Sequence, residues 1–142
     1  MSAKGKIKVG IIGMGRAGFG MQCAELEKRL DKFEITAIRD LEDRQMEACA
    51  KKHLSKTYND MKDLLADKDV ELVSIATRSN DHVKHAVAAL KSGKHVFLEK
   101  PIALSYADTK KLKKATDEAR GQLFIRHNRR FEPAFQHIRE II

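Results

Sequence analysis

The sequence has few cysteines and no long apolar run, and each shortage excludes a class of protein. Only two cysteines, Cys23 and Cys49, occur in 142 residues, and they form no CxxC pair. We therefore expect two reduced thiols packed on helices and no zinc site. No apolar run approaches the roughly 20 residues that span a bilayer, and the first ten residues hold no signal-peptide segment. The sequence thus predicts a cytoplasmic protein without a membrane partner.

No repeat, low-complexity tract or linker divides the chain, and its length fits one domain. Its formal charge of +8 would suit nucleic acid, and four lysines lie close together: Lys110, Lys111, Lys113 and Lys114. The alternative is a solvated helix face, because Asp108, Asp117 and Glu118 share the predicted helix and no aromatic residues interleave to stack on bases. We favour the solvated face and expect no nucleic-acid partner. The same charge would help to collect an anionic ligand.

One stretch near the start organises the rest of the chain. β-Branched residues dominate positions 7–12, as in a strand that is buried on both faces. Gly13, Gly15 and Gly18 follow with the spacing GxGxxG. The first glycine permits a tight turn, the second lets backbone N–H groups approach a pyrophosphate, and the third lets a helix pack closely on the strand. This stretch therefore predicts a dinucleotide site at the start of a helix.

The residues after the turn support this interpretation, since glycines alone often serve only a turn. The spacing predicts an amphipathic helix with four inward residues: Phe19, Cys23, Leu26 and Leu30. A strand over residues 34–39 then leads to Asp40, 22 positions after Gly18. An acidic residue at this place can accept hydrogen bonds from the ribose hydroxyls of adenosine. The alternative is that Asp40 only caps the next helix.

The rest of the chain alternates between predicted strands and helices. Further strands are expected over residues 55–58, 71–77, 95–98 and 122–126, and helices over 41–52, 61–65, 82–91 and 105–119. Six strands form two βαβαβ halves, so we predict a doubly wound parallel Rossmann sheet in the order 3-2-1-4-5-6. His82 and His85 share a helix face, but no acidic or cysteine partner is placed beside them, and we expect no metal site.

With these pieces in place, the sequence resembles the N-terminal NAD(P)-binding domain of the glucose-fructose oxidoreductase, inositol dehydrogenase and MocA-like family, called Gfo/Idh/MocA. The resemblance covers essentially the whole chain. It is carried by GIIGMGRAG at residues 10–18, AIRD at 37–40, the run over 77–105 and HNRRFEP at 127–133, with GKHVFLEKP at 93–101 the most specific. Family members commonly have TPNxxH after the fourth strand; here Arg78 and Ser79 replace its proline and asparagine.

The resemblance implies that Glu99, Lys100 and Pro101 form the EKP motif, whose lysine lies beside the nicotinamide and the reacting carbon. Lys100 is the predicted catalytic residue, since a cation can hold a sugar hydroxyl and stabilise developing charge on its oxygen. The implied cofactor is NAD, with NADP as the alternative, and the implied substrate is a small-molecule sugar or polyol. The predicted cofactor-binding residues are Gly13, Gly15, Arg16, Ala17, Gly18, Asp40, Thr77, His82, Glu99, Lys100 and Arg130.

Family members normally continue into a second α/β domain, which this sequence does not contain. We expect a cofactor domain over residues 1–130, and a linker helix toward that missing domain to begin within residues 131–142. Pro133 suits a first helical position, and four residues form an apolar stripe: Phe135, Ile138, Ile141 and Ile142. We expect a homo-oligomer to cover this stripe, or this helix to fray, and we expect the isolated chain to be inactive. The alternative is a free-standing dinucleotide-binding module for regulation or assembly.

Overall fold

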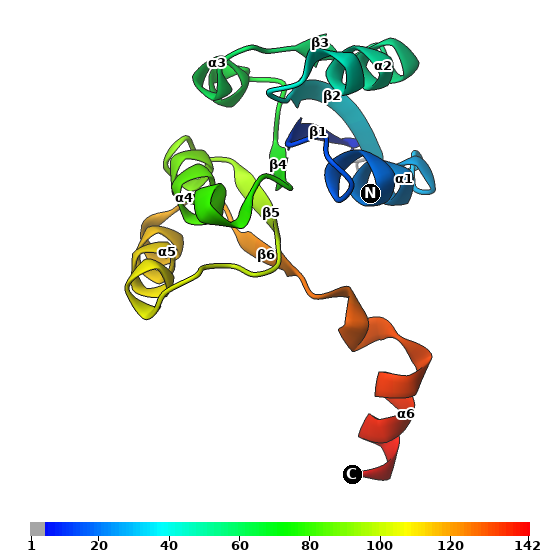
Figure 1. The fold of residues 1–142 in the computed structure, drawn as a ribbon, viewed down its shortest axis with the longest axis vertical. Coiled ribbons are helices and arrows are strands. Elements are labelled where there is room, and N and C mark those ends of the chain that lie inside the picture. The colour runs from blue at the N-terminus through cyan, green and yellow to red at the C-terminus, as the bar shows by residue number, and fades with distance from the viewer. Residues whose placement is uncertain (1–4) are drawn as a thin grey trace.

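The computed structural model describes residues 5–142, apart from the side chain of Asp43, and contains a parallel six-stranded sheet (Figure 1). The strands are β1 (Ile7–Ile12), β2 (Phe33–Arg39), β3 (Lys56–Thr57), β4 (Leu72–Ile75), β5 (His95–Glu99) and β6 (Leu123–Arg126). Their order is β3-β2-β1-β4-β5-β6 with every pair parallel, which confirms the predicted Rossmann sheet. We also predicted that the first ten residues hold no signal peptide. Residues 1–4 of that segment lie outside the residues that the structure describes.

Helices cover both faces of the sheet (Figure 1). They are η1 (Gly18–Cys23), α1 (Ala24–Glu27), α2 (Asp43–His53), α3 (Met61–Ala66), η2 (Ser79–Asp81), α4 (His82–Lys91), α5 (Tyr106–Glu118), η3 (Asn128–Phe131) and α6 (Pro133–Ile141). One buried cluster joins the sheet to η1 and α2, and the other joins it to α3, α4 and α5. Burial on both faces explains the near-continuous apolar runs of the central strands.

The helix after the glycine turn differs from the prediction. It begins as a π-helical turn, η1, in which the N–H of Gln22 donates to the carbonyl of Ala17 at 2.8 Å, and the short α1 ends at Glu27. The predicted inward positions assumed 3.6 residues per turn, but the wider π turn brings Gln22 inward together with the predicted Cys23 and leaves Phe19 exposed. Leu30 lies beyond the helix end and is also exposed, so both of these predicted core positions are wrong.

The two cysteines are buried, and the lysine cluster lies on an exposed helix face. Cys23 and Cys49 are buried free thiols whose Sγ atoms are 3.6 Å apart, as expected for reduced cysteines packed on helices. On α5, three lysines pair with acids one turn away: Lys111 with Asp108 at 3.0 Å, Lys113 with Asp117 at 2.6 Å and Lys114 with Glu118 at 3.8 Å. These exposed pairs fit a solvated helix face.

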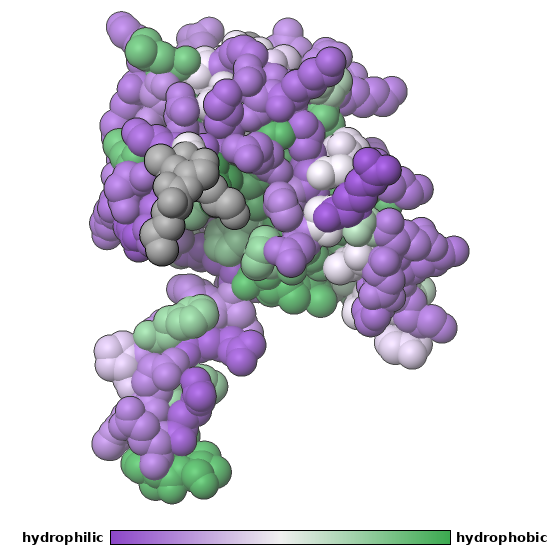
Figure 2. Space-filling model, turned by 180° about the vertical axis from the view of Figure 1, so that it is seen from behind, coloured by the Kyte–Doolittle hydropathy of each residue, from purple (hydrophilic) through white to green (hydrophobic). Residues whose placement is uncertain are grey.

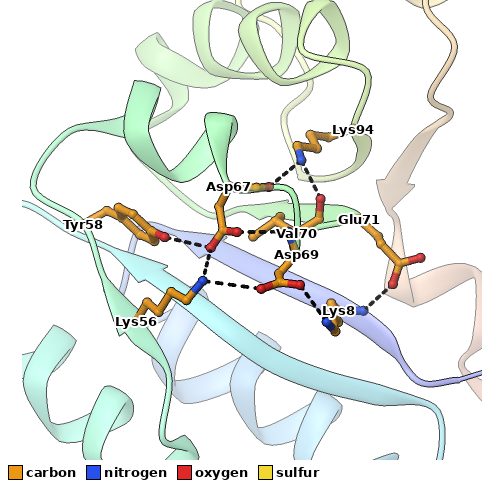
Figure 3. A network of polar contacts seen from close by, with 8 residues as sticks. All are labelled: Lys8, Lys56, Tyr58, Asp67, Asp69, Val70, Glu71 and Lys94. Atoms are coloured by element: carbon orange, nitrogen blue, oxygen red, sulfur yellow. Dashed lines mark hydrogen bonds and ion pairs between the residues drawn. The ribbon is translucent and has the colours of Figure 1, made fainter.

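A polar network holds the loop before β4, at the edge of the sheet where strands begin (Figure 3). Asp67 Oδ2 accepts the Tyr58 hydroxyl at 2.7 Å and the Lys56 ammonium at 3.0 Å. Lys94 Nζ donates to the carbonyl oxygens of Asp67 and Val70, each at 2.7 Å. The Tyr58 hydrogen bond is the largest of the effects that lower the pKa of Asp67 to about 2. This network therefore stabilises the edge opposite the carboxyl ends of the strands.

The last helix, α6, extends away from the body of the domain (Figure 1). Pro133 occupies its first turn, as predicted. All four residues of the predicted stripe are exposed, from 40% for Phe135 to 100% for Ile142. In the part of the chain from residue 5 onward, no helix combines the length and apolarity needed to cross a bilayer.

Candidate functional site

Five strands end at one edge of the sheet and bring the predicted site residues together. Register pairs Ile12 with Arg39 and with Ile75, so the glycine turn, Asp40 and Thr77 follow neighbouring strand ends. Glu99 pairs with Arg126, which places Lys100 at the same edge. Ligands of open α/β sheets bind outside these carboxyl ends.

The glycine turn has the geometry that the motif predicts. Gly13 has φ of +94°, and a Cβ there would lie 2.6 Å from the carbonyl carbon of Ala76. A Cβ on Gly18 would lie 1.8 Å from the carbonyl oxygen of Gly13. A Cβ on Gly15 would meet nothing within 4 Å. The first and third glycines are therefore needed by the fold, whereas the second leaves open space that suits a pyrophosphate.

Asp40 joins the end of β2 to the glycine turn. Its Oδ2 accepts the backbone N–H of Met14, and its Oδ1 accepts those of Leu41 at 2.6 Å and Glu42 at 2.9 Å. The residue that precedes α2 is Glu42, so Asp40 is not the N-cap of this helix. A carboxylate has about four acceptor positions, and three N–H groups leave capacity for a ribose hydroxyl.

A cavity of about 370 Å³ adjoins Asp40, and its wall includes Gly13, Gly15 and Arg39. Arg78, which departs from the family pattern, lines the same cavity. The cavity therefore combines the glycine turn and the acidic residue that the adenosine half of a dinucleotide requires, with two arginines nearby.

His82 connects the loops that follow β4 and β5. It is 2% exposed, with Nδ1 2.7 Å from the carbonyl oxygen of Pro101 and Nε2 3.0 Å from that of Thr77. Both ring nitrogens thus face backbone carbonyls, which leaves none for a metal ion shared with His85. The Nδ1 atom of His85 lies 3.1 Å from the Thr77 hydroxyl, and burial lowers the pKa of His85.

Lys100 is exposed beside a second cavity, of about 260 Å³, whose wall also includes Arg16, Ala17 and Thr77. The preceding Glu99 is buried, and its Oε2 accepts the backbone N–H of Lys100 at 3.0 Å. Thr77 lines both cavities. The two cavities therefore adjoin along the strand ends, as the two halves of a dinucleotide require.

Two charged residues at this end of the site were not predicted, Glu25 and Arg126. Arg126 is 4% exposed and bonds both Glu25 and Glu99, and the Glu25 hydrogen bond is the main cause that raises the pKa of the guanidinium. One signal was present in the sequence: Arg126 ends the predicted last strand, and the carboxyl ends of parallel strands carry the ligand site.

Arg130, predicted from the resemblance, is exposed, and the second cavity is instead lined by Asn128 and Arg129. Its contact with a cofactor remains a prediction.

A doubly wound sheet with a glycine turn, an acidic residue after β2 and a groove along the strand ends defines a dinucleotide-binding Rossmann domain. The chain belongs to the Gfo/Idh/MocA oxidoreductase family: residues 7–127 match the family described as "Oxidoreductase family, NAD-binding Rossmann fold".

The chain is similar to several dehydrogenases. The chain is 36% identical over 137 residues to the myo-inositol 2-dehydrogenase of Thermotoga maritima, covering 96% of this chain and 40% of that protein. It is 32% identical over 136 residues to the scyllo-inositol 2-dehydrogenase (NADP(+)) IolW of Bacillus subtilis, covering 96% and 37%. The crystal structure of the WlbA dehydrogenase from Bordetella pertussis in complex with NADH and UDP-GlcNAcA matches with a TM-score of 0.89 at 27% identity, covering 95% and 39%. The chain spans about 40% of the length of these curated relatives.

Proposed function

We propose that this chain is the cofactor-binding part of an oxidoreductase that moves hydride between a nicotinamide and a CH–OH group of a sugar or polyol. The observation that carries the proposal is a groove along the strand ends, with Asp40 beside one cavity and Lys100 beside the adjoining one. Inositol dehydrogenases among the relatives support a polyol, and the nucleotide sugar bound to the similar WlbA dehydrogenase supports a sugar.

The predicted residues divide naturally between the two halves of the cofactor. The open space at Gly15 would receive the pyrophosphate, next to Gly13 and Gly18, and Asp40 would bind the adenosine ribose. The nicotinamide half would lie against the following residues: Arg16, Ala17, Thr77, His82, Glu99 and Lys100. Arg130 would reach this half only if the turn before α6 closes over it.

The proposed work of Lys100 is electrostatic. Bound NAD supplies the position that accepts or donates hydride. The ammonium of Lys100 would hold the substrate hydroxyl and stabilise its oxygen as negative charge develops. The hydrogen bond from Lys100 N–H to Glu99 and the His82 contact with Pro101 support this role, because both hold the loop that carries the lysine.

We further propose that NAD is preferred over NADP. A 2′-phosphate on the adenosine ribose would approach the Asp40 carboxylate, and the two negative charges repel each other. Arg39 and Arg78 line the same cavity and would offset part of this repulsion, so some NADP binding is expected.

We propose that the cofactor domain comprises residues 1–130 and that 131–142 begin a helix toward further protein. Apolar surface gathers low on the body near the start of α6 and at the helix end (Figure 2). A cavity of about 390 Å³ is lined by Ile7, Phe97 and Phe124 among others. Such surface favours a covering partner, for which we propose a homo-oligomer of this chain through α6. The two free thiols favour a reducing compartment, the cytoplasm.

The proposal is tested by comparing this chain with the complete protein that contains it. The chain alone should bind NADH yet show no appreciable turnover of inositol or glucose, because Lys100 lies on an open face that does not exclude water. The complete protein should oxidise a polyol or sugar. Cofactor binding without turnover in the complete protein would instead favour a regulatory or assembly module. Turnover of about 1 to 1000 per second by the chain alone would show that a homo-oligomer rebuilds the site.

A further inference from the structure

Arg126, the last residue of β6, connects three elements beneath the second cavity. Its Nη1 donates to Glu99 Oε1 at 2.8 Å, and its Nε donates to Glu25 Oε2 at 3.2 Å. Its Nη2 also donates to Glu25 Oε1, so Glu25 is held by two nitrogens of the guanidinium. A planar guanidinium can serve two carboxylates in this way, whereas an ammonium cannot match the geometry. Arg126 therefore ties α1, β5 and β6 together.

The contacts continue from Arg126 to the backbone of Lys100. Glu99 uses one oxygen for Arg126 and the other for the Lys100 N–H, at 3.0 Å. Glu99 is only 5% exposed, so without Arg126 its carboxylate would be a buried and unpaired charge. Such a group would rotate toward water or take up a proton, and either change would weaken its hydrogen bond with the Lys100 N–H.

We propose that Arg126 is a positioning residue for the nicotinamide end of the site, anchored by Glu25 and acting through Glu99. The inference rests on the proposed function, which puts the nicotinamide beside Lys100. Charge supports it as well as geometry. The two carboxylates outnumber the single guanidinium, so this group of three residues carries a net negative charge that suits the cationic ring of oxidised nicotinamide.

The structure separates this end of the site from the adenosine end. Arg126 and Glu99 line the cavity of about 260 Å³, and neither lines the cavity of about 370 Å³ beside Asp40. ADP-ribose contains the adenosine, the pyrophosphate and the second ribose but lacks nicotinamide. Comparing ADP-ribose with NADH therefore isolates the part of the affinity that depends on the nicotinamide.

The experiment is calorimetric titration of this chain and its Arg126→Met variant with NADH and with ADP-ribose. Loss of charged hydrogen bonds around Lys100 should weaken NADH binding roughly tenfold or more. ADP-ribose affinity should stay within about twofold, the usual scatter for uncoupled sites. Arg126→Lys, which keeps the charge but not the fork, should restore part of the NADH affinity. Arg29→Met is the matched control, because Arg29 is exposed and pairs with its near neighbour Asp31, and it should change neither affinity.

Glu25→Gln carries the same test if Arg126→Met does not fold, because it preserves side-chain volume and leaves Arg126 bonded to Glu99. It should give a smaller loss with the same selectivity for NADH. Equal losses for NADH and ADP-ribose, or no loss for either, would overturn the positioning role while the proposed function stands. Failure of the unaltered chain to bind either ligand would overturn the proposed function and this inference with it.

Discussion

Replacing Gly15 with alanine should separate cofactor binding from folding. A Cβ at this position meets no atom within 4 Å, and the backbone there is outside the left-handed region. Alanine should therefore leave the fold unchanged or stabilise it by up to about 1 kcal/mol, because it reduces the entropy of the unfolded chain. The same methyl group would occupy the space that we assign to the pyrophosphate. Overpacking of this kind costs about 2 kcal/mol, which is roughly a thirtyfold increase in Kd.

Gly18→Ala should behave in the opposite way. Its Cβ would lie 1.8 Å from the Gly13 carbonyl oxygen, where ordinary contact begins at 3.4 Å. The turn must move to admit it, at a cost of about 3 kcal/mol, so we expect Tm to fall by about 10 °C. Gly20→Ala is the matched control, because Gly20 is exposed on the same η1 turn with open space around it.

The assay combines thermal unfolding without ligand and NADH titration of the same four proteins. The reasoning predicts weak binding with normal stability for Gly15→Ala, and reduced stability for Gly18→Ala. Gly20→Ala should match the unaltered chain in NADH affinity and be at least as stable. If Gly15→Ala binds NADH as tightly as the unaltered chain, the pyrophosphate does not lie over Gly15 and the assignment is refuted.

Three further predictions concern charge. NAD should bind more tightly than NADP, because a 2′-phosphate about 4 Å from Asp40 meets about 4 kcal/mol of repulsion per charge pair at an effective dielectric near 20. Asp40→Ala should narrow the difference in affinity between the two cofactors. Tighter binding of NADP than of NAD by the unaltered chain would contradict this preference. In the complete protein, Lys100→Ala should lower kcat far more than cofactor affinity, and an unchanged kcat with weaker NAD binding would remove its catalytic role. Asp67, with its pKa lowered from 3.8 to about 2, should add about 1 to 2 kcal/mol of stability that is complete above its unfolded pKa and lost as pH falls through 2. In urea unfolding, the free energy of unfolding of Asp67→Asn should therefore not show this decrease between pH 4 and 2. Equal slopes of that free energy against pH for both proteins would disprove the contribution of Asp67.

Much of the fold could be predicted because its signals are local. β-Branched runs over 7–12 and 71–77 mark strands that are buried on both faces. Because the strands alternate with helices along the chain, few strand orders are possible. Ser105 caps α5 by accepting the Asp108 N–H at 3.1 Å, and Gly93 ends α4 with φ of +82°, both as their residue types indicate. The edge that carries the site follows from the strand order alone.

The parts that could not be predicted depend on long-range geometry. A spacing of 3.6 residues does not reveal the π-helical turn at η1, so Phe19 was placed in the core although it is exposed. The pairing of Arg126 with Glu25 joins residues 101 positions apart, and no local pattern encodes it. The hydrogen bond from the Met14 N–H to Asp40 is likewise a tertiary contact. Because of it, Asp40 also holds the glycine turn in place.

The most direct test is a map of amide chemical shifts in this chain during titration with NAD. The account predicts that the shifted amides cluster at the carboxyl ends of the strands, over residues 13–18, 40–42, 77–82 and 99–100, with the residues around Arg126 included. Asp67, Val70 and Lys94 at the opposite edge should not shift (Figure 3). Shifts confined to the opposite edge, or to the solvated face of α5, would contradict the central claim that these strand ends form a dinucleotide site.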